Sequence, residues 1–266
     1  MNDPLPSPDD APPSDLGPAS QPVARAPQVQ VQLPQHRPIV TYVLLGVTVV
    51  IFLLQYVGIN TLGGDIVAYY GLKVNDLILR GQYWRLITPM FLHGSILHLG
   101  FNMYALYLFG PGLESQYGHK RFLVLYLLGG FAGNVMSFLF SDANSLGSST
   151  AIFGLLGAEG VFIYQNRKIL GARAQRGLVQ LIVLAVVNFM FGLTPGSGID
   201  NWGHLGGLLG GTLFAWFGGP ILQVEGIYPN LKLIDRRQPS EVIWAAVGVL
   251  VLFGGLAAVA IFYRLR

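Results

Sequence analysis

Long apolar runs constrain this chain more than any other feature of its sequence. Four of them are nearly free of charge and cover residues 39–57, 122–140, 177–193 and 242–263. Each has a length typical of an α-helix that crosses a bilayer, roughly 17–25 residues. Only 11% of the residues are charged, against about 25% in an ordinary soluble domain. The runs therefore predict an all-α polytopic membrane protein.

Three further segments are apolar but interrupted by polar side chains, namely 96–113, 149–164 and 203–218. They raise the predicted number of spans to seven. Residues 39–218 would form a core of six spans, 219–241 a cytoplasmic linker, and 242–266 the seventh transmembrane helix. The loop 58–94 contains several tyrosines and Trp84. Because such aromatics favour the membrane interface, we expect this loop to be structured and partly embedded.

The basic residues predict an orientation. If the N-terminus is cytoplasmic, the inside segments hold Arg25, Arg37, Lys120, Arg121, Arg167, Lys168, Arg173, Arg176, Lys232, Arg236 and Arg237. The outside segments then hold only Lys73, Arg80, Arg85, Arg264 and Arg266. This asymmetry favours a cytoplasmic N-terminus and a C-terminus outside, in an integral protein of the bacterial inner membrane. Residues 1–38, rich in Pro, Ala, Ser and Gln, are predicted to be a disordered cytoplasmic tail.

Several classes of chemistry find no support in the sequence. The chain has no cysteine, which excludes disulfides and thiolate catalysis. No His, Asp and Glu residues have metal-ligand spacing, and no glycine-rich loop matches a nucleotide fingerprint. We therefore expect no metal and no cofactor. The basic loops explain the positive charge, so nucleic acid is not an expected partner; the oligomeric state stays open.

Ser149 and His204 stand at the starts of two of the polar-interrupted spans. The segment 149–164 would rise about 24 Å, less than the roughly 30 Å hydrocarbon core, so Ser149 would lie below the outer surface. Glycines spaced for close helix packing occur in both spans. They would bring the serine and the histidine together as a nucleophile and its base. Taken singly, each residue has a structural explanation, as a helix cap or a buried hydrogen-bonded histidine.

A second polar set precedes them in the chain. His98 and Asn102 are four residues apart in the segment 96–113 and so share one helix face. Both side chains can donate hydrogen bonds to an oxyanion, although a pair of this kind also serves as polar glue between helices. Polar groups at this depth imply a cavity that admits water from the outer face.

Together these residues resemble the rhomboid family of intramembrane serine proteases. The resemblance covers about residues 38–218 and rests on Gly81-Gln82-Tyr83-Trp84-Arg85-Leu86, on His93, His98 and Asn102-Met103, on the Ser149 segment and on Gly203-His204-Leu205-Gly206-Gly207. It implies a six-helix rhomboid-like bundle plus one C-terminal transmembrane helix.

The resemblance also implies roles for residues. Ser149 would be the nucleophile and His204 the base, while the Ser149 backbone N–H, His98 and Asn102 would stabilise the oxyanion. The supporting residues would be Phe153, stacked on the histidine, His93 in the cavity, and Trp84 and Arg85 in the outer loop. The span 177–193 and the loop after it resemble a gate and cap for transmembrane protein substrates in the lipid bilayer.

Three positions depart from expectation. Thr150 replaces the second glycine of the family's Gly-x-Ser-Gly motif, Gln82 stands where an acidic residue is common, and Glu159 lies inside a span. Thr150 would crowd the first helical turn and add a hydroxyl beside the nucleophile. Glu159 has two interpretations, a partnered or snorkelling carboxylate or a proton-linked site. Two other functions were weighed: a non-catalytic protein that binds membrane clients, favoured by Thr150 alone, and a channel or transporter, which the absence of an internal repeat disfavours.

Overall fold

Helices dominate the computed structural model, which describes residues 37–227 and 230–266. The described residues belong to one compact unit that begins at Gln32. The predicted disordered tail lies almost wholly outside the described residues. The elements are α1 (Ile39–Thr61), α2 (Ile66–Gly71), α3 (Asn75–Leu79), η2 (Tyr83–Leu86), η3 (Thr88–Phe91), α4 (Ile96–Tyr117), α5 (His119–Phe140), α6 (Ser149–Gln165), α7 (Arg167–Leu170), α8 (Ala172–Gly192), α9 (Asn201–Gly218), β1 (Leu222–Glu225), β2 (Lys232–Asp235) and α10 (Pro239–Arg264).

Seven long helices coincide with the seven predicted spans: α1, α4, α5, α6, α8, α9 and α10. Within the described part of the chain, four of them are long and apolar enough to cross a membrane by length and composition, namely α1, α5, α8 and α10. The remaining three, α4, α6 and α9, carry the polar residues singled out above. The protein is thus a helical membrane protein of six core helices and one C-terminal helix.

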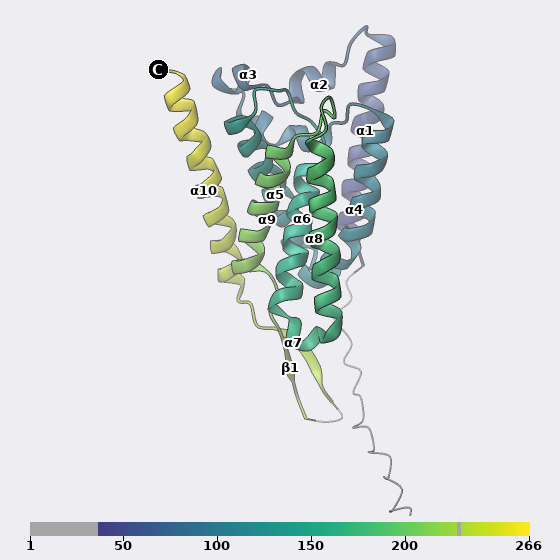
Figure 1. Ribbon diagram of the computed structural model, residues 1–266, viewed down its shortest axis with the longest axis vertical. Coiled ribbons are helices and arrows are strands. Elements are labelled where there is room, and N and C mark those ends of the chain that lie inside the picture. The colour runs from purple at the N-terminus through teal and green to yellow at the C-terminus, as the bar shows by residue number, and fades with distance from the viewer. Residues whose placement is uncertain (1–36, 228–229) are drawn as a thin grey trace, which may run out of the picture. The chain divides into compact units, whose positions relative to one another are not determined.

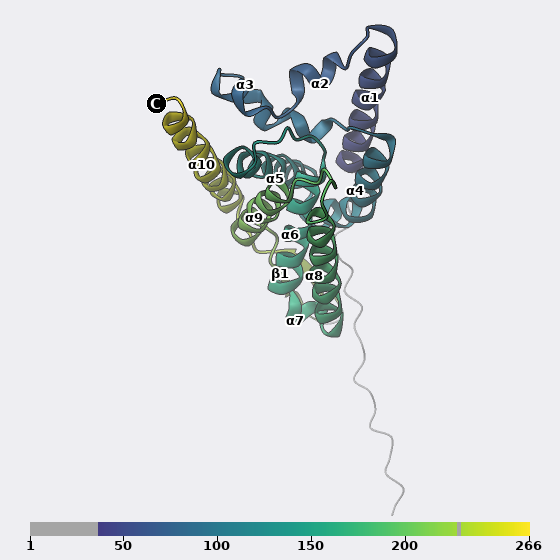
Figure 2. The same ribbon diagram turned by 45° about the horizontal axis from the view of Figure 1, so that its top comes forward.

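The centre of the bundle is formed by α5, α6 and α9, which pack against one another. Figures 1 and 2 show α10 beside α5 and α9 at one side of this centre, and α1 beside α4 at the other. The remaining long helix, α8, lies against α6. The buried apolar core therefore follows the three central helices.

Glycines permit the close approach of the central helices. A Cβ at Gly207 on α9 would collide with the Thr150 carbonyl oxygen, and one at Gly211 would collide with the Gly154 carbonyl oxygen, both on α6. At Gly129 on α5 a Cβ would lie 3.0 Å from the Cα of Gly154. Backbones this close gain packing that larger side chains would prevent. This contact aligns the first turns of α6 and α9.

The loop between α1 and α4 is structured, as predicted. It contains α2, α3 and two short 3₁₀ helices, and it joins the loop before α6 through a two-way backbone bridge between Lys73 and Ser145. We call the side of the bundle that carries these loops the loop side. The opposite side, which carries β1 and β2, is the hairpin side (Figure 1).

The predicted linker 219–241 is more ordered than a simple connection. It contains the antiparallel pair β1 and β2, with Leu222 opposite Asp235. Asp235 accepts a hydrogen bond from Arg121 at 2.8 Å, and Asn166 binds both ends of the turn from α9 into β1. Strand β1 alternates apolar and polar residues, and these contacts fix the base of the hairpin.

The C-terminal helix α10 contacts the core through one narrow stripe. Its buried residues recur every four positions, at Ala245, Val249, Phe253 and Ala257. This spacing places them on one helix face. At the loop side, Arg264 donates to the Leu139 carbonyl at 3.0 Å and lies over the Phe138 ring. Most other side chains of α10 are exposed on the bundle surface.

Candidate functional site

Ser149 opens α6 on the loop side of the bundle. The residue before it, Ser148, is the N-cap, and Gly147 has a φ of 126°, which an L side chain rarely adopts. A Cβ on Gly147 would lie 2.8 Å from His98 Nε2 and 3.7 Å from Ser149 Oγ. The glycine therefore lets the chain pass between these side chains. At the start of a helix the backbone N–H groups lack partners, so Ser149 lies where negative charge is favoured.

His204 lies one turn inside the neighbouring helix, α9. Asp200 caps this helix by accepting a hydrogen bond from the Gly203 N–H at 2.8 Å. The imidazole is stacked on Phe153, with ring centroids 4.2 Å apart and planes 14° from parallel. Phe189 of α8 meets the Phe153 ring edge-on at 5.4 Å. Since Phe153 is one turn after Ser149 on α6, the stack holds His204 beside the first turn of α6.

Ser149 and His204, the predicted pair, are not hydrogen-bonded to each other in the described part of this structure. Among the described residues no hydrogen bond joins Ser149 to His204, and His204 Nδ1 has no hydrogen-bond partner. Asp200 Oδ2 likewise has no partner in this part of the chain. Catalytic hydrogen bonds are often long before substrate binds, so the arrangement is compatible with a pair that closes in the complex.

Three further predicted residues gather near Ser149. His93 Nε2 lies 3.3 Å from Ser148 Oγ, and its ring meets that of His98 edge-on at 5.1 Å. The His98 N–H is bound by the Ser95 hydroxyl, which caps α4. The side-chain amide of Asn102 donates to the His98 carbonyl at 3.0 Å. The structure thus brings His93, His98 and Ser149 together, while the Asn102 amide faces its own helix.

Thr150 packs against the neighbouring helices α5 and α9. Its Cβ and Cγ2 fill the space left by Gly133 on α5 and Gly203 on α9, each of which would be obstructed if it carried a side chain. Thr150 is buried, and its hydroxyl is without a hydrogen-bond partner within the described residues. The threonine therefore packs between α5, α6 and α9.

Trp84 and Arg85 organise the loop between α1 and α4 through contacts within that loop. The Trp84 indole donates to the Tyr70 carbonyl at 3.0 Å. Arg85 is buried and donates to the carbonyls of Leu72 and Tyr69. Its Nε donates to the amide oxygen of Gln82 at 2.8 Å, so this glutamine supplies the acceptor that an acidic residue would offer.

Two buried polar residues that position the site were not singled out from the sequence. Gln55 of α1 accepts a hydrogen bond from the His93 N–H at 3.1 Å and donates to the His93 carbonyl at 3.3 Å and to Asp65 at 2.7 Å. A lone glutamine in the apolar run 39–57 was the available signal. It fixes the backbone of His93 from a helix 38 residues away in sequence.

Lys73 is the second such residue. Its ammonium donates to the carbonyls of Ser141 and Ala143 at 2.7 and 2.9 Å. These residues belong to the loop between α5 and α6, which leads to Ser149. Burial lowers the pKa of Lys73 to about 8, partly opposed by the carboxylates of Asp200 and Asp142. The lysine thus ties the loop between α1 and α4 to the chain just before Ser149.

The described residues offer neither a metal site nor a clear partner for Glu159. No cluster of three or more His, Asp or Glu side chains able to hold a metal occurs in residues 37–227 and 230–266. Glu159 is partly exposed on α6, and over the same residues it makes no ion pair. Its two interpretations therefore stay open.

Comparison with known proteins decides the family. The family model of the Rhomboid domain matches residues 80–221, which include Arg85, His98, Ser149 and His204. The chain belongs to the rhomboid family. It is 34% identical over 154 residues to the putative rhomboid protease YdcA of Bacillus subtilis (strain 168), covering 57% of this chain and 73% of that protein.

Two other relatives are longer than the aligned region. The rhomboid protease GluP of Bacillus subtilis (strain 168) is 36% identical over 220 residues, covering 83% of this chain and 41% of GluP. RHOMBOID-like protein 9, chloroplastic, of Arabidopsis thaliana is 39% identical over 155 residues, covering 58% of this chain and 36% of that protein. This rhomboid chain therefore spans about two fifths of the length of these relatives.

Proposed function

We propose that this rhomboid chain is an intramembrane serine endopeptidase that cleaves transmembrane-anchored proteins in or near their membrane helix. Ser149 is the nucleophile and His204 the general base. The observation that carries the proposal is the Phe153–His204 stack, because it places a buried imidazole beside the helix start that bears Ser149. The relatives GluP and YdcA, both described as rhomboid proteases, support it.

The reaction begins when His204 removes the proton from Ser149 Oγ as the oxygen attacks the scissile carbonyl. His204 then gives this proton to the leaving amine, and a water attacks the acyl-enzyme by the same route in reverse. General acid–base help of this kind accelerates a reaction by about 10²–10⁴. Because His204 is not held by a carboxylate, the Phe153 ring fixes its orientation.

The oxyanion is bound at the start of α6. The Ser149 backbone N–H, His98 and Asn102 are the proposed donors, and each such donor contributes about 10²–10³ in rate. His98 already lies against Gly147, beside the serine. One N–H of the Asn102 amide donates to the His98 carbonyl, which leaves its second N–H as the donor for the oxyanion. We therefore expect Asn102 to act without giving up its bond to α4.

Substrate helices reach the site past α8. This helix has a single buried residue, Ala174, and its Phe189 contacts the Phe153–His204 stack. A substrate must unwind locally, because a hydrogen-bonded helix hides its carbonyls. We infer small residues at the scissile bond and helix-breaking residues nearby. The bacterial inner membrane, with a cytoplasmic N-terminus and the loop side outside, is the proposed location, on the distribution of basic residues.

A fluorophosphonate probe tests the proposal without a known substrate. The purified protein is incubated with the probe and the adduct is located by mass spectrometry. We expect an adduct on Ser149 that is lost in Ser149→Ala and in His204→Ala. Ser137→Ala is the matched control, since Ser137 is buried in α5 and its hydroxyl has no partner within the described residues.

The outcome separates the two functions. Labelling of Ser149 that depends on His204 and persists in Ser137→Ala supports the peptidase. A folded sample that stays unlabelled, while a known rhomboid protease reacts in parallel, rejects the dyad. That result would favour the client-binding alternative.

A further inference from the structure

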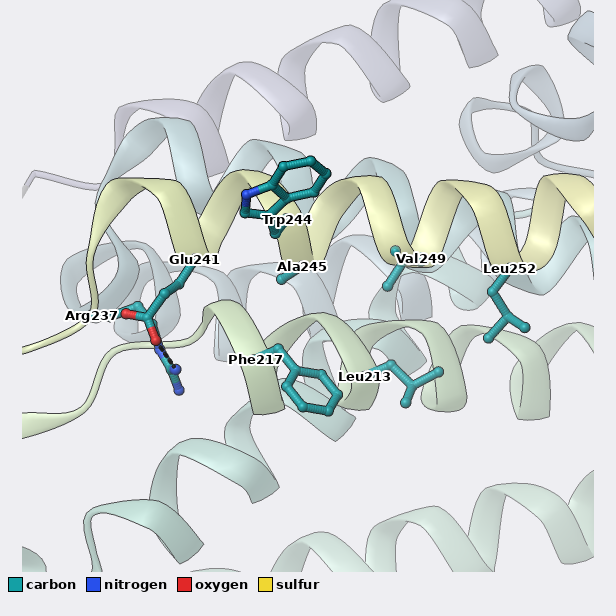
Figure 3. Close-up of a pocket in the computed structure, with 9 residues that line it drawn as sticks. Leu213, Phe217, Arg237, Glu241, Trp244, Ala245, Val249 and Leu252 are labelled. Atoms are coloured by element: carbon teal, nitrogen blue, oxygen red, sulfur yellow. Dashed lines mark hydrogen bonds and ion pairs between the residues drawn. The ribbon is translucent and has the colours of Figure 1, made fainter.

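A groove runs between α9 and α10, away from Ser149 and His204. Figure 3 shows Leu213 and Phe217 of α9 facing Val249 and Leu252 of α10 across it. Its volume is about 500 Å³, within the range of about 300–1,000 Å³ that is typical of small-molecule sites. The walls are apolar except at one end, where Arg237 and Glu241 lie.

The groove is open to the bilayer along its length. Phe217 is 58% exposed, Leu252 47% and Trp244 71%. At Gly248, a Cβ would have no atom within 4 Å, so this glycine leaves the middle of the groove unfilled. A membrane-facing apolar channel of this kind is filled by hydrocarbon rather than water.

The length of the groove matches one leaflet. From Glu241 to Leu252 the axis of α10 advances about 16 Å, at 1.5 Å for each residue. Half of the hydrocarbon core is about 15 Å. One extended acyl chain, entering at the hairpin side, would therefore run the whole length of the groove.

The polar end lies where a lipid headgroup would be. Arg237 donates to the carbonyls of Gly219 and Trp216 and to the Glu241 carboxylate, each at 3.0–3.1 Å. A guanidinium has five N–H donors, so two remain available. Glu241 balances the charge of Arg237, and the exposed Arg236 beside it adds an excess positive charge. Trp216 and Trp244 fit the headgroup level, where tryptophans gather.

We propose that this groove binds one anionic phospholipid. The acyl chain lies between Phe217 and Leu252 over Gly248, and the phosphate is bound by Arg237 and Arg236. The lipid completes the contact between α9 and α10, whose direct packing is limited to the narrow stripe of small and apolar residues. It thereby stabilises the C-terminal helix on the core.

Native mass spectrometry of the full chain tests this proposal. The protein is reconstituted with phosphatidylglycerol or with phosphatidylcholine of the same chains, then released from detergent. We expect one retained phosphatidylglycerol and little phosphatidylcholine. Gly248→Leu fills the groove and should lose the adduct. Gly254→Leu is the matched control, since a Cβ at Gly254 also has open space but the residue does not line the groove.

The charged end is tested separately with Arg236→Gln. In the described residues, the Arg236 side chain makes no hydrogen bond or ion pair. The variant should retain lipid but lose the preference for phosphatidylglycerol. An unchanged preference would overturn the headgroup assignment. Wild-type protein without a retained lipid, or Gly248→Leu that retains as much as Gly254→Leu, would overturn the site.

Discussion

Two helices of this rhomboid protein, α6 and α8, contact the same histidine yet are built in opposite ways. The catalytic candidate α6 is 17 residues long and 12 of them are buried. The neighbouring α8 is 21 residues long and only Ala174 is buried. Large apolar side chains of α8 are thus exposed to lipid, while the glycine-containing α6 lies inside the bundle. In a membrane this is expected, because lipid is as apolar as leucine and gives such side chains no reason to be buried.

The loop before α6 and the loop after α8 also differ, in how many long-range hydrogen bonds hold them. The chain leading into α6 is held by Lys73, by Asn75, which donates to the Ser141 carbonyl, and by the Pro89 carbonyl, which accepts from Gly147. The hydrogen bonds of the loop leaving α8 are local among the described residues, including those of Ser197 and the one from the Thr194 N–H to the Phe191 carbonyl. Ser149 therefore follows a segment held by long-range hydrogen bonds, while the loop after α8 has local bonds and should open at lower cost.

The largest expected effect is at the contact between α6 and α9. Gly207→Ala places a Cβ against the Thr150 carbonyl oxygen, which cannot give way because it belongs to the helix backbone. We expect a loss of about 3 kcal/mol or more, at or above the upper end for overpacked cores. Thermal unfolding in detergent measures it.

Gly46→Ala on α1 is the control for this substitution. A Cβ at Gly46 meets nothing within 4 Å, so the change should be neutral or stabilising by about 0.5–1 kcal/mol. Equal melting temperatures for the two variants would show that the α6–α9 contact is less tight than described.

A pair of truncations compares α6 and α8 directly. Leu155→Ala on α6 removes a fully buried side chain and should cost about 2–5 kcal/mol. Met190→Ala on α8, where the side chain is 61% exposed, should stay within about 0.5 kcal/mol. Unfolding monitored by circular dichroism in the same detergent gives both values. A large loss for Met190→Ala would mean that α8 is held more firmly than its exposure indicates.

Phe153→Leu tests how α6 orients the base. Leucine keeps an apolar contact but loses the stack on His204. An aromatic pair contributes about 1 kcal/mol beyond its buried area, so the rate of fluorophosphonate labelling should fall about fivefold. An unaltered rate in a folded variant would remove Phe153 from the proposed site.

The difference between α6 and α8 also explains which helices could be predicted from the sequence. The apolar runs predicted an all-α membrane protein with seven long helices. The resemblance to a known family pointed to His98, Ser149 and His204 as site residues. Length and hydropathy together identify α8 and miss α6 and α9 as spans. Helix α6 is too short, at 17 residues, while the glycines and polar residues of α9 lower its apolar character.

The positioning residues were harder to find for a different reason. Gln55 acts on a partner 38 residues away, and Lys73 on partners 68 and 70 residues away. No local pattern encodes such pairs, because they depend on how the outer loop folds back over the bundle. The hairpin of β1 and β2 lies in the segment for which the sequence predicts only a linker. Strands of four residues give a weak periodic signal.

Lys73 tests the fixed loop before α6 through the pH dependence of stability. Its pKa is lowered to about 8 in the fold, from an ordinary value of 10.5. Between these values the unfolded chain binds more protons than the folded one, so stability should rise with pH over this range. Below about pH 8 the cost of burying the charged ammonium is fully present. The melting temperature of the wild type, relative to Lys73→Met, should therefore increase from pH 8 to pH 10. Parallel curves would mean that Lys73 titrates as in water, and that the loop before Ser149 is no better fixed than the loop after α8.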